Sequence, residues 1–192
     1  MGAFPTSCVR RMIGPMAFFS SSVRLWLIPS AVLLIGSAAW GALRYPHLPG
    51  RIPKHIGADG VDAWTDRSIG SAFLLVFLYA GTTLLMAGCA ELTLRVTPRD
   101  ELPDPGASPF AAAQATSPLL NRPVSRESAR RVARALLLFN ACIGVSFLAG
   151  CGILWRSTPD PNVPAWFFAA MTLPLLAGTA VTIAAAVKGR GR

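Results

Sequence analysis

Four long apolar blocks, separated by polar segments, dominate the pattern of this chain. They cover about residues 25–43, 69–92, 135–155 and 163–187. A helix rises about 1.5 Å per residue, so blocks of this length match a hydrocarbon layer of about 30 Å. The pattern therefore predicts an all-α integral membrane protein with four transmembrane helices, paired as two helical hairpins.

The composition agrees with lipid as the solvent. Of the 192 residues, 53% are hydrophobic and only 14% are charged, whereas soluble domains carry about 25% charged residues. The net charge of +9 is not read as nucleic-acid binding, because the positive charges flank the apolar blocks and do not form one soluble face. We expect no nucleic-acid partner.

The distribution of basic residues predicts the orientation in the membrane. Most of the 18 lysine and arginine residues lie before the first block, between the second and third blocks, or after the fourth. The positive-inside rule then places both termini and the middle loop in the cytoplasm. We expect a multi-pass membrane protein with loops one and three outside.

These patterns divide the chain into five parts. They are a flexible cytoplasmic N-terminus (1–24), a first transmembrane hairpin (25–92) with a patterned outer loop (44–68), a flexible cytoplasmic loop rich in Pro, Ala and Ser (93–124), a second transmembrane hairpin (125–187) and a basic tail (188–192).

Several polar and small residues of the second hairpin suggest specific contacts. Arg126, Arg130 and Arg134 are spaced by one helical turn before the third block, so we expect a cytoplasmic extension of that helix whose arginines reach lipid phosphates. Asn140 is expected to form an interhelical hydrogen bond. Small residues at 142, 146 and 150 favour close helix packing within the molecule first, and a homo-oligomer second.

The outer loop carries a distinct pattern. Pro46, Pro49 and Pro53 are expected to keep its first half extended, and residues 57–60 (Gly-Ala-Asp-Gly) to form a turn. Both histidines of the protein and several acids lie in this loop. The conspicuous positions are Tyr45, Pro46, Leu48, Pro49, Ile52, Pro53, His55, Gly60, Asp62 and Trp64.

This loop pattern resembles the signature of a bacterial membrane family, domain of unknown function 1648, found alone and in SdpI-type immunity and signalling proteins. The resemblance covers about residues 25–92. It implies a hairpin in a bacterial cell inner (plasma) membrane that displays the loop, with His55, Gly60 and Asp62 at matching positions. It implies no known reaction. The chain has Ile56 and Arg67 where relatives usually carry an aromatic residue and a lysine.

The loop chemistry leaves alternatives open. His47, His55, Asp59 and Asp62 are weak candidates for a zinc-like metal site. The same residues also suit a purely structural role, in which the acids bond loop amides or nearby cations, or recognition of an external ligand or peptide. No catalytic residue and no cofactor is predicted.

We therefore expect a non-enzymatic accessory, sensor or immunity-like factor that acts through its extracytoplasmic loop. Its expected partners are the lipid bilayer and a membrane or extracytoplasmic protein or peptide. The alternatives are a membrane-embedded metal-dependent hydrolase or metal sensor using the loop histidines and aspartates, and a small transporter. The transporter is disfavoured because no apolar block carries a carboxylate at mid-depth.

Overall fold

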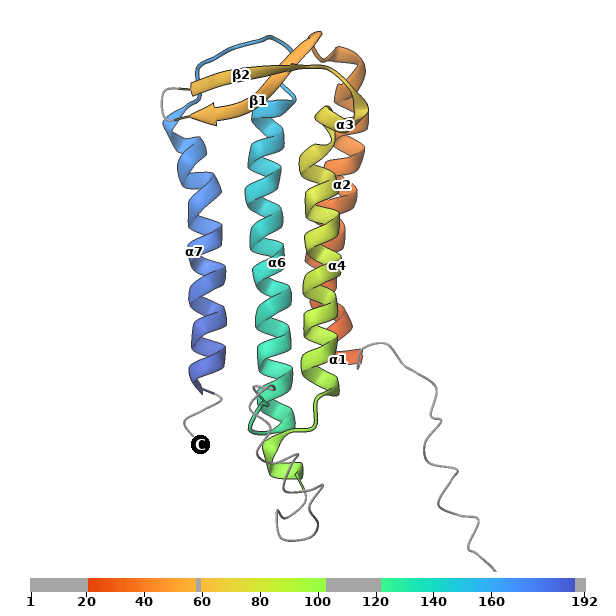
Figure 1. Cartoon of the computed structure of the whole chain (residues 1–192), viewed down its shortest axis with the longest axis vertical. Helices are drawn as coiled ribbons and strands as arrows, with labels where there is room; N and C mark the ends of the chain where they lie inside the picture. Colours follow the sequence, from red (N-terminus) through yellow and green to blue (C-terminus); the bar gives the residue numbers. More distant parts are fainter. Residues whose placement is uncertain (1–20, 58–59, 103–121, 189–192) are drawn as a thin grey trace, which may run out of the picture.

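The computed structural model describes residues 21–57, 60–102 and 122–188. Four helices in this part of the chain are long and apolar enough to cross a membrane. They stand side by side, and a two-stranded sheet lies across one end of the bundle (Figure 1). The four predicted membrane spans are therefore confirmed, and the protein is a multi-pass membrane protein.

The elements follow the apolar blocks closely. The first span comprises α1 (Ser21–Arg24), the 3₁₀ turn η2 (Leu25–Leu27) and α2 (Ile28–Arg44). The connection to the second span contains η3 (Tyr45–His47), β1 (Arg51–Gly57) and β2 (Gly60–Asp66). The remaining elements are α3 (Ile69–Ala72), α4 (Leu74–Arg95), η4 (Arg99–Glu101), α6 (Arg126–Leu154) and α7 (Ala165–Lys188).

Serine caps define where two of the helices begin. The Ser68 hydroxyl accepts a hydrogen bond from the backbone N–H of Ser71, in a reciprocal capping box that starts α3. Ser125 caps α6 through the N–H of Ser128. Because α6 begins at Arg126, the basic segment before the third apolar block is helical, as predicted.

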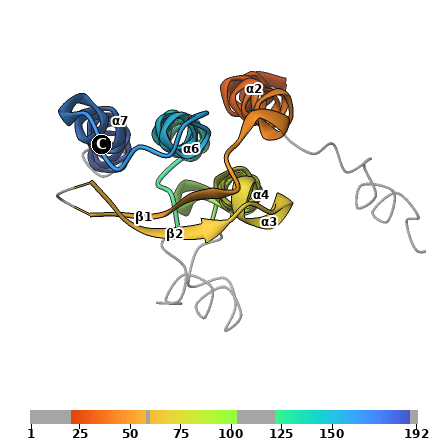
Figure 2. The ribbon, with the colours of Figure 1, turned by 90° about the horizontal axis from the view of Figure 1, so that it is seen from above.

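Helix α6 is the centre of the bundle. It packs against α7, α4 and α2, whereas α2 and α4 contact each other less extensively. Viewed from above, α6 lies between α2 and α7 (Figure 2). The other three spanning helices thus pack around α6.

A buried polar contact ties three of these helices together. Asn140 of α6 is fully buried, and its amide nitrogen donates to Ser30 Oγ (2.9 Å) and Thr83 Oγ1 (3.1 Å). Polar groups away from water need such partners, because lipid offers none. The predicted interhelical hydrogen bond of Asn140 is confirmed.

The small residues of α6 also serve packing within the molecule. Ser146 donates to the carbonyl of Met171 in α7 (2.7 Å). A Cβ on Gly178 of α7 would lie 3.1 Å from Cβ of Cys142, so α6 and α7 approach closely there. A homo-oligomer through this face stays a prediction.

The outer loop departs from the expected all-α class. β1 and β2 pair antiparallel, with Ile52 opposite Thr65 and Gly57 opposite Gly60, and the register shifts around His55. An isolated two-stranded sheet is marginally stable. Here the sheet rests on the bundle, which the loop sequence alone does not reveal.

The two ends of the molecule differ in character. The sheet, the link between α3 and α4, and the α6–α7 connection lie at what we call the sheet end (Figure 1). The start of α1, the end of α7, and η4 lie at the opposite end, which we call the terminal end. Flexible segments were predicted at 1–24 and 93–124, and residues 1–20 and 103–121 of these segments lie outside the described residues.

The segments flanking residues 103–121 are held together at the terminal end. Arg126 forms a two-point ion pair with Glu101 (2.7 and 2.8 Å). The backbone N–H groups of Arg99 and Asp100 donate to the carbonyls of Pro123 and Val124. Arg126 is therefore occupied with the connection between the second and third spans.

Candidate functional site: a cavity beneath the sheet

The tip of the sheet is docked on the connection between α6 and α7. The N–H of Val61 donates to the carbonyl of Pro161 (2.9 Å). Gly60, beside it, has φ +118°, a conformation that favours glycine. A Cβ at Gly60 would also collide with the Pro161 carbonyl oxygen. Glycine at the predicted turn thus permits both the local backbone and the docking.

The base of the sheet is anchored on a buried indole. Leu48 and Ile52 of the outer loop share one apolar cluster with Trp155 at the end of α6. The Trp155 ring nitrogen donates to the carbonyl of Ala72 (2.8 Å), at the break between α3 and α4. A Cβ on Gly41 would lie 2.7 Å from the indole, so glycine leaves room for Trp155 against α2.

An arginine closes the loop between its two ends. Arg67 Nη1 donates to the carbonyl of Leu48 (2.6 Å), and its guanidinium carbon lies 5.5 Å from the centre of the Tyr45 ring. The backbone N–H of Arg67 donates to Gly50 (2.8 Å). These contacts give Tyr45 and Arg67 structural roles and hold the sheet in a fixed position above the helices.

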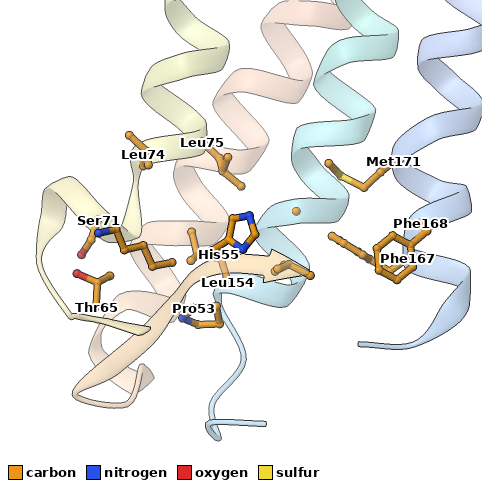
Figure 3. Close-up of a pocket in the computed structure, with 13 residues that line it drawn as sticks. Pro53, His55, Thr65, Ser71, Leu74, Leu75, Leu154, Phe167, Phe168 and Met171 are labelled. Atoms are coloured by element: carbon orange, nitrogen blue, oxygen red, sulfur yellow. The ribbon is translucent and has the colours of Figure 1, made fainter. Parts of the chain in front are cut away.

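Between the sheet and the helices lies a cavity of about 460 Å³. Its walls are mostly apolar and come from three spanning helices, α4, α6 and α7 (Figure 3). The wall residues are Leu74, Leu75, Gly150, Leu154, Phe167, Phe168 and Met171. A volume and lining of this kind suit an apolar ligand group.

The sheet supplies a more polar roof. Pro53, Lys54, His55 and Ile56 of β1 and Thr65 of β2 line the cavity, together with Ser71 of α3. Within the described part of the chain, Lys54 forms no ion pair. The cavity therefore combines apolar walls with one cationic and several hydrogen-bonding groups at its top.

His55 is oriented by the neighbouring strand. Its Nδ1 lies 2.7 Å from Oδ1 of Asp62. Because a carboxylate oxygen accepts, this contact places a proton on Nδ1 and leaves Nε2 for another partner. Figure 3 shows the His55 ring on the helix side of the strand, toward the cavity.

The described residues bring together two of the four metal candidates, His55 and Asp62. His47 is exposed on η3, and Asp59 lies outside the described residues. Among residues 21–57, 60–102 and 122–188, no group of three His, Cys, Asp or Glu side chains could hold a metal ion. The metal site stays a prediction that would need a further donor.

The other motif positions frame the hairpin. Trp64 lies opposite Pro53 in the strand register and is half-buried. Pro46 is exposed within η3, and Pro49 precedes β1. These residues shape the loop and do not line the cavity, apart from Pro53.

Sequence reasoning missed the cavity itself. Lys54 was only one of the nearby cations for the loop acids, and Phe167 and Phe168 lay within the apolar block at about 163–187. Their juxtaposition depends on the docking of the sheet over α7. The sequence offered one signal, since the lysine beside His55 precedes the second span and the two adjacent aromatics begin the fourth, so both lie at span ends on the same predicted side.

Four membrane-spanning helices capped at one end by an ordered, motif-bearing sheet define the class of this multi-pass membrane protein. Residues 32–79 match the family model described as Domain of unknown function (DUF1648). The matched segment runs from α2 through the sheet into α4, which confirms the family resemblance of the loop motif. No curated protein and no solved structure matches the chain.

Proposed function

We propose that this protein is a non-enzymatic sensor, accessory or immunity-like factor of a bacterial inner membrane, acting at the outer face through the sheet-roofed cavity. In this proposal both termini are cytoplasmic and the sheet is extracytoplasmic. The observation that carries it is the cavity of about 460 Å³ between apolar helix walls and the family-motif strand with His55.

The lining suits an amphipathic ligand with an apolar chain and an acidic headgroup. Lys54 and His55 at the roof supply a cation and a ring nitrogen, and Ser71 and Thr65 add hydroxyl oxygens. Below them Leu75, Leu154 and Met171 offer only apolar surface. Such an arrangement places a polar group under the sheet and an alkyl chain among the helices.

An alkyl chain would have a route from the bilayer. Leu74 of α4 and Phe168 of α7 line the cavity and are 53% and 41% exposed. In a membrane, this exposed apolar surface meets lipid. A ligand could therefore enter sideways between α4 and α7 and be read by the sheet.

The test compares binding of tritiated laurate and dodecanol to the full chain in nanodiscs of zwitterionic lipid. We expect laurate to bind more tightly, because its carboxylate can pair with Lys54. The Lys54→Gln variant should weaken laurate binding about tenfold, the effect of losing one charged hydrogen bond. Dodecanol binding should be unchanged.

Arg51→Gln is the matched control, since Arg51 is an exposed cation on the same strand that does not line the cavity. Equal binding of laurate and dodecanol, or equal losses in both variants, would contradict the proposed ligand class. Wild-type behaviour of a His55→Ala, Asp62→Ala double variant in every measurable phenotype would show that the loop is scaffold only.

A further inference from the structure

A second cavity, at the terminal end, is basic and unrelated to the sheet. It has a volume of about 410 Å³ and lies among η2, α6 and α7. Its charged part consists of Glu127, Arg130, Arg131 and Arg134 of α6. This second cavity lies at the opposite end of the bundle from the cavity beneath the sheet and shares no residue with it.

The arginines of this cavity differ in whether they have an ion-pair partner. Arg131 pairs with Glu127 (2.8 Å), so that pair contributes no net charge. Within the described residues, Arg130 and Arg134 form no ion pair. Nε of Arg134 is buried without a hydrogen-bond partner. A buried donor without a partner is costly, so a ligand that accepts from it is favoured.

The sequence singled out a different set. Arg126, Arg130 and Arg134 were expected to reach lipid phosphates together, but Arg126 is bound to Glu101 at 2.7 and 2.8 Å. Arg126 is also absent from the cavity lining. The two arginines of the set that have no ion-pair partner among the described residues are thus Arg130 and Arg134, which lie one helical turn apart on α6.

The rest of the cavity continues into apolar surface. Leu138 lies one turn beyond Arg134 on α6, and Val181 and Ala185 of α7 face the same space. Trp26, 39% exposed, lines it from the start of the first span. Tryptophan favours the boundary between headgroups and acyl chains. The lining thus changes from cationic to apolar, which complements a phospholipid with an anionic phosphate and apolar acyl chains.

We propose that this cavity binds one anionic glycerophospholipid, with its phosphate held by Arg130 and Arg134 and an acyl chain along Leu138 and Val181. Guanidinium groups suit this role because their planar fork donates two hydrogen bonds to phosphate oxygens. The two uncompensated positive charges favour a lipid without a balancing ammonium group. This inference does not depend on the function proposed for the sheet end.

The experiment is native mass spectrometry of the full chain, delipidated in detergent and titrated with dioleoyl phosphatidylglycerol or dioleoyl phosphatidylcholine. We expect phosphatidylglycerol to bind at least about tenfold more tightly, since charged hydrogen bonds of this kind suffice for that ratio. The Arg130→Gln, Arg134→Gln double variant should lose the preference.

The matched control is the Arg51→Gln, Arg99→Gln double variant, which loses the same charge at two exposed arginines outside the cavity. It should keep the preference. Should the cavity double variant fail to fold, Arg134→Lys replaces it: this change keeps the charge and removes the fork, and is expected to reduce the preference in part.

Three results would overturn the proposal. The first is equal binding of the two lipids by the wild-type chain, and the second is an equal loss in the cavity and control variants. The third is displacement of phosphatidylglycerol by millimolar glycerol 1-phosphate, which would assign the site to a soluble phosphate ester.

Discussion

At the scale of single residues, the position of the sheet depends on Gly60, where no larger side chain would fit. Gly60 combines a positive φ of 118° with a backbone facing the Pro161 carbonyl. Its neighbour Val61 donates the hydrogen bond that fixes the tip of the sheet. Any other residue at position 60 would therefore meet both backbone strain and a steric collision.

We predict that Gly60→Ala loosens the sheet without unfolding the helices. The free energy of local opening should fall by about 1–3 kcal/mol, the cost of holding a non-glycine residue in such a conformation. Hydrogen–deuterium exchange of residues 51–66 should accelerate accordingly, while α6 keeps its protection.

Gly50→Ala is the control, because Gly50 lies in the same loop and a Cβ there meets nothing within 4 Å. It should leave the exchange of the sheet unchanged. Identical exchange in the two variants would contradict the role assigned to the docking of Gly60.

At the scale of elements, Asn140 connects three spanning helices from the centre of the bundle. Its two hydrogen bonds reach Ser30 of α2 and Thr83 of α4. Hydrophobic burial does not favour helix association within lipid, so such bonds and close packing carry more of the specificity. The contact fixes the register of α2 and α4 against α6.

We predict a measurable coupling between Asn140 and Ser30. In a double-mutant cycle of Asn140→Ala with Ser30→Ala, followed by unfolding in micelles, the interaction energy should be about 0.5–1.5 kcal/mol. Combining Asn140→Ala with Thr82→Ala should give no coupling, since the Thr82 hydroxyl bonds its own helix at Leu78 (2.8 Å). Coupling of equal size in both cycles would refute the specific bond.

At the scale of the whole molecule, the two ends hold different numbers of positive charges. Among the described residues, the basic side chains of the sheet end are Arg44, Arg51, Lys54, Arg67 and Arg156. Those of the terminal end are Arg24, Arg95, Arg99, Arg122, Arg126, Arg130, Arg131, Arg134 and Lys188. On the positive-inside rule we propose that the terminal end is cytoplasmic. This orientation is part of the proposed function and has its own test.

We predict that a membrane-impermeant maleimide labels Arg51→Cys in intact cells and labels Arg99→Cys only after lysis. Both changes are made in a chain whose four native cysteines are replaced by alanine. Both positions are exposed, so access to the reagent depends on the side of the membrane. The opposite labelling pattern would invert the orientation and place the sheet in the cytoplasm.

Features that local sequence encodes were predictable. The spans follow from runs of apolar residues, and the Asn140 bond follows from one amide in an otherwise apolar helix. Gly57 and Gly60, predicted as the ends of a turn, lie opposite each other in the strand register. In each case the physical cause lies within a few residues of the effect or in the lipid around it.

Features that need distant segments were not predictable. Strand pairing in the loop depends on anchoring by Trp155, and the docking depends on Pro161. The cavity beneath the sheet forms because β1 lies above α7, a helix that begins more than a hundred residues after β1. Alternation in the proline-rich loop was too weak to predict a sheet without these contacts.

The anchoring of the sheet by Trp155 also limits how the family domain can be transplanted. The matched segment ends at residue 79, yet the apolar cluster under its sheet is completed by Cys151 and Trp155. A chimera that receives residues 32–79 alone would contain the motif but not the residues that support the sheet. The recipient protein must provide an indole, or a side chain of equivalent shape, on a third helix. The segment needed for a stable sheet is therefore longer than the segment that matches the family model.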